Sequence, residues 1–156
     1  MVEISFDFKE TLDAVIGGER HSYCFQCGAC VGDCPSARYS KSGFNPRLIV
    51  LRTILGQQET LLEEGSIIWE CTNCYNCYER CPQDVRPVEV ITALKNMAAK
   101  RKSNPEDVRS MVKTVETKGM TTVITALVDK RRLGLGLESL KETPVSDIHQ
   151  LLAHDE

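Results

Sequence analysis

The sequence contains the run Cys71-Thr-Asn-Cys74-Tyr-Asn-Cys77-Tyr-Glu-Arg-Cys81-Pro82. Its four cysteines are separated by two, two and three residues and are followed by a proline, which is the bacterial ferredoxin pattern for a [4Fe–4S] cluster. The pattern has an earlier copy, Cys24-Phe-Gln-Cys27-Gly-Ala-Cys30-Val-Gly-Asp-Cys34-Pro35. Together the two copies use all eight cysteines of the chain. The sequence therefore predicts an electron carrier with two [4Fe–4S] clusters.

The spacing also predicts which cysteines share a cluster. The first three cysteines of each copy can surround one face of a cluster, whereas the fourth is placed differently and, in two-cluster ferredoxins, binds the other cluster. We therefore expect two crossed ligand sets: Cys24, Cys27, Cys30 and Cys81 for the first cluster, and Cys71, Cys74, Cys77 and Cys34 for the second. Such crossing makes the two copies one folding unit and holds the clusters close together.

Zinc binding and disulfide bonds are the alternative uses of these cysteines. Zinc sites more often combine two separated pairs, whereas six of these eight cysteines stand in runs of three with two-residue gaps. A disulfide framework is typical of small secreted proteins, and neither the 156-residue length nor the repeated spacing favours it here. Iron–sulfur ligation is the favoured interpretation.

Composition and charge exclude several other classes of protein. The formal net charge is −3, and Lys130-Arg131-Arg132 is the only strong basic run, which is typical of a helix end, so no nucleic-acid partner is expected. No apolar stretch is long enough to cross a bilayer, and the first residues do not form a signal peptide pattern. We expect a cytoplasmic protein without a membrane partner.

Periodicity predicts a mostly α-helical fold. Helical spacing of apolar residues, with proline and asparagine at helix starts, predicts helices over residues 9–16, 46–55, 59–64, 87–98, 106–118, 121–132 and 146–153. Alternation of apolar and polar residues predicts a short N-terminal β segment at Val2, Ile4, Phe6 and Phe8. We expect an α-helical ferredoxin-type domain over residues 1–104, with its core at 20–100, and a helical C-terminal extension over residues 105–156. Subunit docking is the favoured role of this extension, and a loosely ordered tail is the alternative.

The remaining residues supply no catalytic group. The chain has no phosphate-binding glycine loop and no flavin or nucleotide fingerprint, so no catalytic residue is expected on it. His21, His149 and His154 have no partner at a ligand spacing and are interpreted as surface residues. Phe25, Tyr75 and Tyr78 lie inside the cysteine runs, where aromatic rings can shield clusters from water.

The two cysteine runs resemble those of the two-cluster iron–sulfur subunit of heterodisulfide reductase from methanogenic archaea. The resemblance spans roughly residues 20–100, and its most particular part is Cys74-Tyr-Asn-Cys77-Tyr-Glu-Arg-Cys81-Pro82. It implies an α-helical ferredoxin fold with two [4Fe–4S] clusters in an oxidoreductase complex of several subunits. It also implies relay of electrons from a flavin-bearing subunit to a catalytic, cysteine-rich subunit, which reduces the mixed disulfide of coenzyme M and coenzyme B in methanogenesis. A hydrogenase or formate dehydrogenase is a further partner that the resemblance implies.

Two alternative functions keep the same clusters. The helical two-cluster domain is also similar to the iron–sulfur parts of other flavin-dependent oxidoreductases, of the glycolate-oxidase or fumarate/succinate type. A freely diffusing ferredoxin is the third alternative, although the long helical extension disfavours it. In the leading interpretation the chain is a non-catalytic electron-relay subunit, because this sequence lacks the adjacent cysteines that the resemblance implies for the catalytic partner.

Overall fold

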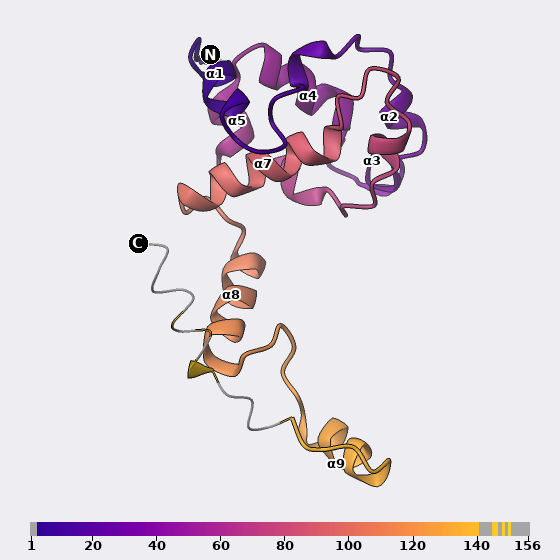
Figure 1. Ribbon diagram of the computed structural model, residues 1–156, viewed down its shortest axis with the longest axis vertical. Coiled ribbons are helices and arrows are strands. Elements are labelled where there is room, and N and C mark those ends of the chain that lie inside the picture. The colour runs from indigo at the N-terminus through magenta and orange to yellow at the C-terminus, as the bar shows by residue number, and fades with distance from the viewer. Residues whose placement is uncertain (1–2, 141–144, 147, 149, 151–156) are drawn as a thin grey trace. The chain divides into compact units, whose positions relative to one another are not determined.

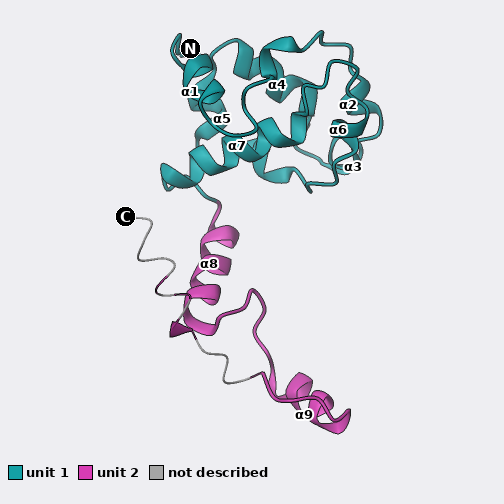
Figure 2. Ribbon diagram, viewed as in Figure 1, with its two compact units in different colours: residues 1–104 teal, residues 105–156 magenta. Residues whose placement is uncertain are grey.

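The computed structural model of the chain describes residues 3–140, 145–146, 148 and 150. The chain divides into two compact units, Met1–Asn104 and Pro105–Glu156 (Figures 1 and 2). The described residues form helices and two short 3-10 turns, and they include no β-strand. The elements of unit 1 are α1 (Phe8–Asp13), η1 (His21–Tyr23), α2 (Ala29–Gly32), α3 (Pro35–Tyr39), α4 (Pro46–Ile54), α5 (Gln58–Leu62), η2 (Ile67–Glu70), α6 (Asn76–Glu79) and α7 (Pro87–Lys100). Those of unit 2 are α8 (Glu106–Lys118) and α9 (Ala126–Gly134).

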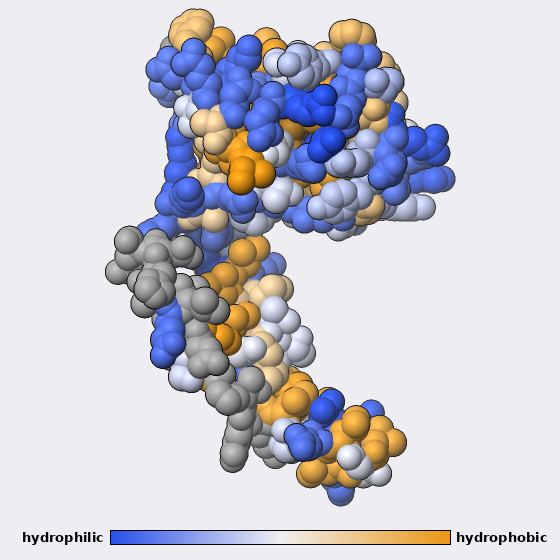
Figure 3. Space-filling model, in the orientation of Figure 1, coloured by the Kyte–Doolittle hydropathy of each residue, from blue (hydrophilic) through white to orange (hydrophobic). Residues whose placement is uncertain are grey.

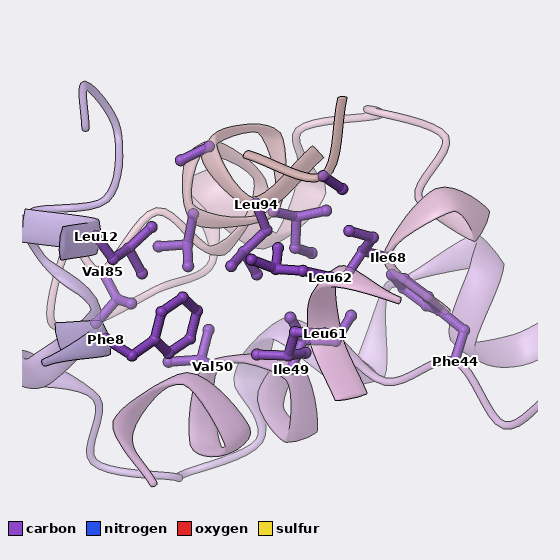
Figure 4. Packing of buried hydrophobic residues seen from close by; sticks show 14 of the residues in the cluster. Phe8, Leu12, Phe44, Ile49, Val50, Leu61, Leu62, Ile68, Val85 and Leu94 are labelled. Carbon is purple, nitrogen blue, oxygen red and sulfur yellow. The ribbon is translucent and has the colours of Figure 1, made fainter. Parts of the chain in front are cut away.

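Unit 1 is built around α7, which packs against α4, α5, α6 and η2. Apolar residues recur along α7 at helical spacing, so one face of the helix is buried, including Val88, Ile91, Leu94 and Ala98. α4 and α5 add Ile49, Val50, Leu61 and Leu62 to the same core, with Phe8 and Leu12 toward one end and Phe44 and Ile68 toward the other (Figure 4). Burial of each such large side chain contributes about 1.5–3 kcal/mol relative to exposure.

Proline residues begin three helices of unit 1: α3 after the first cysteine run, α4 between the runs, and α7 after the second run. Pro35, Pro46 and Pro87 occupy the first turns of α3, α4 and α7. A proline there costs no hydrogen bond, because the first N–H groups of a helix have no partner within the helix. The side chain of Asn45 caps α4 by accepting a hydrogen bond from the Leu48 N–H at 3.1 Å, as the Asn45-Pro46 pair predicts.

The predicted N-terminal β segment is wrong over the described residues. Residues 3–5 have no regular structure, Phe6 lies in a turn, and Phe8 begins α1. Phe8 and Leu12 are both fully buried, whereas Ile4 and Phe6 are exposed. The four-residue spacing of Phe8 and Leu12 therefore decided the local structure, because a helix buries both side chains on one face. Val2 lies outside the described residues.

The glycine pair after α1 passes close to two other parts of the unit. A Cβ atom added to Gly18 would lie 2.2 Å from the carbonyl oxygen of Leu12, and one added to Gly17 would lie 3.2 Å from the Cβ of Glu89 on α7. Gly17 also has a positive φ of 90°. The absence of side chains thus lets Gly18 fold tightly against the end of α1 and Gly17 approach α7.

The described helices of unit 2 expose much of their apolar surface. α8 has no buried residue, and its apolar side chains Met111 and Val112 are 52% and 45% exposed. Leu127, Leu133 and Leu135 are also exposed in or directly after α9. Figure 3 shows hydrophobic residues gathered over both helices on the face in view. None of the described helices combines the length and hydrophobicity needed to span a membrane.

The prediction of one helix over residues 121–132 is wrong at its start. α9 begins at Ala126, and Thr125 precedes it as an N-cap whose side chain accepts a hydrogen bond from the Val128 N–H. The preceding residues 121–124 are bends or irregular chain. Their β-branched side chains are stiff and lower helix propensity, which explains the shortened helix. The helix predicted over 146–153 falls largely outside the described residues.

Candidate metal centre

The two cysteine runs fold as matching loops, each followed by one turn of helix. In both loops the residues two and four positions after the first cysteine have positive φ angles: 56° at Gln26 and 82° at Gly28, then 51° at Asn73 and 63° at Tyr75. These left-handed residues curl each loop back on itself. α2 and α6 follow the loops and pack against each other. The sequence repeat is therefore also a repeat of backbone conformation.

The first cavity is lined by cysteines from both loops. Cys24, Cys27 and Cys30 come from the first loop and Cys81 comes from the end of the second. The cavity encloses about 350 Å³ of space, part of it open to solvent. Its other walls include Val50 of α4 and Pro87, the first residue of α7.

The second cavity has the complementary arrangement. Cys71, Cys74 and Cys77 of the second loop line it together with Cys34, the last cysteine of the first run. It encloses about 280 Å³, again including space open to solvent, and its apolar walls include Phe44, Pro46, Val88 and Ile91. The structure thus brings the eight cysteines around two cavities in the groups Cys24, Cys27, Cys30, Cys81 and Cys34, Cys71, Cys74, Cys77.

Polar contacts hold the two loops against each other. The amide of Asn76 in α6 donates a hydrogen bond to the carbonyl oxygen of Asp33, directly after α2, at 3.0 Å. Arg80 forms an ion pair of 2.7 Å with the Asp33 carboxylate. The Ser36 hydroxyl in α3 donates to the carbonyl oxygen of Glu70 at 2.7 Å. The exposed ion pair is worth at most about 1 kcal/mol, so packing and these hydrogen bonds carry the contact.

Several N–H groups donate hydrogen bonds to the cysteine sulfurs. The Cys24 Sγ accepts from the backbone N–H of Gln26 at 3.4 Å and from its side-chain amide at 3.2 Å. The sulfurs of Cys34 and Cys81 accept from the N–H groups of Ala37 at 3.4 Å and Val85 at 3.3 Å. Such donors favour the thiolate form that binds metal, and they tune the potential of a bound cluster.

Burial disfavours the thiolate form of three of the cysteines, Cys30, Cys71 and Cys77. Burial raises the pKa of the Cys30 thiol to about 11 and that of Cys77 to about 12, and nearby cysteines add to both shifts. Burial also raises the pKa of Cys71. Cys30 of the first cavity acts on Cys77 of the second, so the two cavities are neighbours.

A cationic centre in each cavity would remove this penalty, because metal binding displaces protons from thiols. Each cavity supplies four cysteine sulfurs within apolar walls, and four thiolates are the donor set of a [4Fe–4S] cluster. The residues present therefore fit that group. Among the described residues, no three His, Cys, Asp or Glu side chains form a site for a single metal ion.

Lys95 is a residue near the second cavity that the sequence interpretation missed. Its Nζ donates to the carbonyl oxygen of Cys71 at 3.0 Å and lies 5.8 Å from the centre of the Trp69 ring. Burial lowers the pKa of this lysine, and the charge of Cys71 acts in the opposite direction. The sequence feature that could have identified Lys95 is its position on α7, one turn after Ile91, which lines the cavity.

His21 is another residue whose placement differs from the prediction. It is fully buried rather than exposed, and its Nδ1 lies 2.8 Å from the carbonyl oxygen of Gly18. Its Nδ1 is also 3.4 Å from a carboxylate oxygen of Asp13. The ring therefore anchors η1 beside the first cysteine loop. His149 and His154 lie outside the described residues.

Comparison with known protein families identifies the class of domain that contains the two cavities. Residues 20–85 match the family described as a 4Fe-4S dicluster domain. This range contains all eight cysteines of the two cavities. The chain therefore carries a [4Fe–4S] dicluster domain.

Longer matches define the particular family. The chain is 32% identical over 143 residues to the iron-sulfur subunit of the CoB–CoM heterodisulfide reductase of Methanopyrus kandleri, which covers 92% of this chain and 69% of that relative. It is 32% identical over 120 residues to a subunit of the ferredoxin:CoB-CoM heterodisulfide reductase of Methanosarcina mazei, covering 77% and 72%. It is 42% identical over 78 residues to a subunit of the H(2)/formate:CoB-CoM heterodisulfide,ferredoxin reductase of Methanococcus maripaludis, and there it spans only 40% of the relative's length. The chain belongs to the family of heterodisulfide reductase iron–sulfur subunits.

Proposed function

We propose that the chain is the electron-transfer iron–sulfur subunit of a heterodisulfide reductase complex. It accepts electrons from a flavin-bearing partner and passes them to a catalytic, cysteine-rich partner, where the coenzyme M–coenzyme B heterodisulfide is reduced during methanogenesis. The observation that carries the proposal is the pair of neighbouring cavities, each lined by three cysteines of one loop and the last cysteine of the other. Membership of the family supports the choice of complex.

The proposed ligands are the residues that line the two cavities. Cys24, Cys27, Cys30 and Cys81 hold the first cluster, and Cys34, Cys71, Cys74 and Cys77 hold the second. Bound [4Fe–4S] clusters supply one-electron transfer at these positions. The chain's own residues keep the sites in place, donate hydrogen bonds to the sulfurs and limit contact with water.

Disulfide reduction itself requires a partner. Cleavage of the heterodisulfide S–S bond takes two electrons and two protons and yields two thiols. The chain has no adjacent cysteines and no catalytic constellation in its sequence, so its contribution is delivery of single electrons.

A hydrogenase or formate dehydrogenase is proposed as a further member of the complex, with the cytoplasm as the location. Residues 105–156, with exposed apolar side chains on both helices, are proposed as the subunit-docking extension.

Anaerobic purification of the native complex tests the function. The purified chain should contain about eight irons, as two [4Fe–4S] clusters require. It should accept electrons from a reduced flavoprotein but should not reduce the heterodisulfide until the catalytic partner is added. Turnover by the chain alone would contradict the relay role. Co-purification with a flavin-dependent hydroxyacid oxidase, instead of the two proposed partners, would assign the chain to another complex.

A further inference from the structure

Tyr75 has a backbone conformation that normally favours glycine. Its φ and ψ are 63° and 0°, in the left-handed region, at the residue that precedes α6. The matching position of the first loop is Gly28, with φ 82° and ψ 0°. Glycine adopts this conformation without penalty, whereas a residue with a Cβ is strained there. The chain therefore accepts strain in the second loop that it avoids at the same point of the first.

The side chain of Tyr75 lies at the border between the second cavity and the protein surface. Tyr75 lines the second cysteine cavity, and it also lines an open depression on the surface together with Ile16 and Glu89. Its side chain is half exposed. Tyr75 thus lies between the cavity and solvent, next to the exposed Cys74. A tyrosine ring at this point reduces the contact of water with a group bound in the cavity.

Neighbouring residues hold the tyrosine in this place. The ring of Tyr78 lies 6.1 Å from that of Tyr75 at an interplanar angle of 52°. The guanidinium of Arg86 lies over the Tyr78 ring at 5.0 Å, and it is itself held by an ion pair of 2.8 Å with Asp84. Tilted aromatic pairs and cation–π contacts of this kind are attractive. Tyr78 thus contacts both Tyr75 and Arg86.

The first cavity has no equivalent cover among the described residues. A Cβ placed on Gly28 would meet nothing within 4 Å, so this position is open. The aromatic residue of the first cavity is Phe25, at a different place in its loop and 74% exposed. The second cavity has the buried Phe44 in addition to Tyr75. The two cavities therefore differ in how far aromatic rings cover them.

We propose that Tyr75 shields the second cluster from water and thereby lowers its reduction potential, and that the strained backbone is retained to keep the ring there. The inference rests on the proposed assignment of a [4Fe–4S] cluster to this cavity. Reduction adds one negative charge to a cluster, and water stabilises the more highly charged state. Removal of the ring should therefore make the second cluster easier to reduce and leave the first cluster unchanged.

The test is Tyr75→Gly in the anaerobically purified full chain. A redox titration followed by electron paramagnetic resonance should show a positive shift in the potential of one cluster and no shift in the other. Thermal unfolding reports the net effect of two opposed changes, because glycine relieves the strained backbone but removes the contact with the Tyr78 ring. A residue with only a packing role would change the unfolding temperature without moving one potential. Two unshifted potentials would overturn the inference.

Matched variants separate the ring from the strain. Tyr75→Phe keeps the ring and should keep the potential, and a shift as large as that of Tyr75→Gly would overturn the inference. Lys102 has a similar left-handed backbone, with φ 58°, at an exposed position after α7. Lys102→Gly therefore relieves backbone strain away from the cavities, and it should shift neither potential. If Tyr75→Gly does not fold, Tyr75→Asn removes the ring at a position that asparagine tolerates. If the unmodified chain does not show two cluster signals, the proposed function is contradicted. If it shows two signals whose potentials are unchanged by substitution of Tyr75, only this inference is contradicted.

Discussion

Cys34 and Cys81 are the residues on which the ligand assignment depends. Each ends one cysteine run and lines the cavity that the other run forms. The remaining six cysteines would be grouped in the same way with or without crossing. A substitution at one of these two positions therefore distinguishes a crossed arrangement from two separate four-cysteine sites.

Replacement of Cys81 by serine should damage the cluster held by Cys24, Cys27 and Cys30. The variant keeps a side chain of similar size but replaces a thiolate ligand, so the first cluster should be lost or altered while the second remains. Iron content and the electron paramagnetic resonance signals of the reduced protein measure this. Cys34→Ser is the matched control and should affect the other signal. Perturbation of the Cys71 cluster by Cys81→Ser would show that the sites do not cross.

At the scale of single residues, the sequence predicted the candidate ligands but little around them. The cysteine spacing identifies all eight thiols, and the structure gathers them in the two predicted groups, although ligation itself stays a prediction. His21 could not be placed, because it owes its burial to the packing of the folded unit, whereas Lys95 could have been found from its position one turn after Ile91. The left-handed backbone at Tyr75 has no signal in the tyrosine itself, and the sequence points to it only through Gly28, the residue at the matching position of the first run.

At the scale of elements, the join between α1 and the rest of unit 1 depends on the space left by glycine. Gly18 lies directly against Leu12, a fully buried residue of α1. α1 also packs against α4. A side chain at position 18 would clash with the backbone and side chain of Leu12 and so distort the end of α1.

Gly18→Ala should lower the free energy of unfolding by about 1–3 kcal/mol, the usual cost of overpacking. For a domain of about 100 residues this corresponds to a fall in Tm of at least about 4 °C. Thermal unfolding of the holoprotein followed by circular dichroism measures the change. Gly134→Ala is the matched control, because an added Cβ there meets nothing within 4 Å. Equal Tm values for both variants would show that α1 does not rely on this contact.

The helices could be predicted where caps and periodicity agree. Asn45-Pro46 and Pro87 mark the starts of α4 and α7, and both helices form there. The N-terminal segment was misread because its alternating pattern competes with the four-residue spacing of Phe8 and Leu12, which tertiary burial favours. The start of α9 was misplaced because β-branched residues oppose the helix over 121–125.

At the scale of the whole molecule, cofactor binding and folding of unit 1 are coupled. Cys24, Cys71 and Cys81 pack against the hydrophobic core, and Cys34 belongs to it, so both cavities border the core. Walls of the cavities come from α4 and α7, the two helices that pack at the centre of the unit. Without a bound group, the half-buried thiols would face one another across poorly filled space.

Removal of iron with a chelator under anaerobic, reducing conditions should unfold much of unit 1. Binding energy at sites assembled from distant residues is folding energy, so the apoprotein should lose helical circular dichroism and cooperative melting. Unit 2 contains no cysteine, and its helices should account for residual signal. Addition of iron and sulfide should restore both properties. An iron-free chain with an unchanged spectrum and melting curve would contradict this coupling.

The crossed arrangement has a consequence for synthesis on the ribosome. With the proposed ligands, the second site is complete once Cys77 has emerged, and the first site only once Cys81 has emerged. The first site begins earlier, at Cys24, but it is completed later than the second site. Cys81 lies only four positions after Cys77, so the two sites are completed almost together. A nascent chain that stalls before Cys77 offers no full set of ligands to the cellular machinery that delivers clusters. With this arrangement, neither cluster can have its full set of ligands until the whole stretch up to Cys77 has been synthesised.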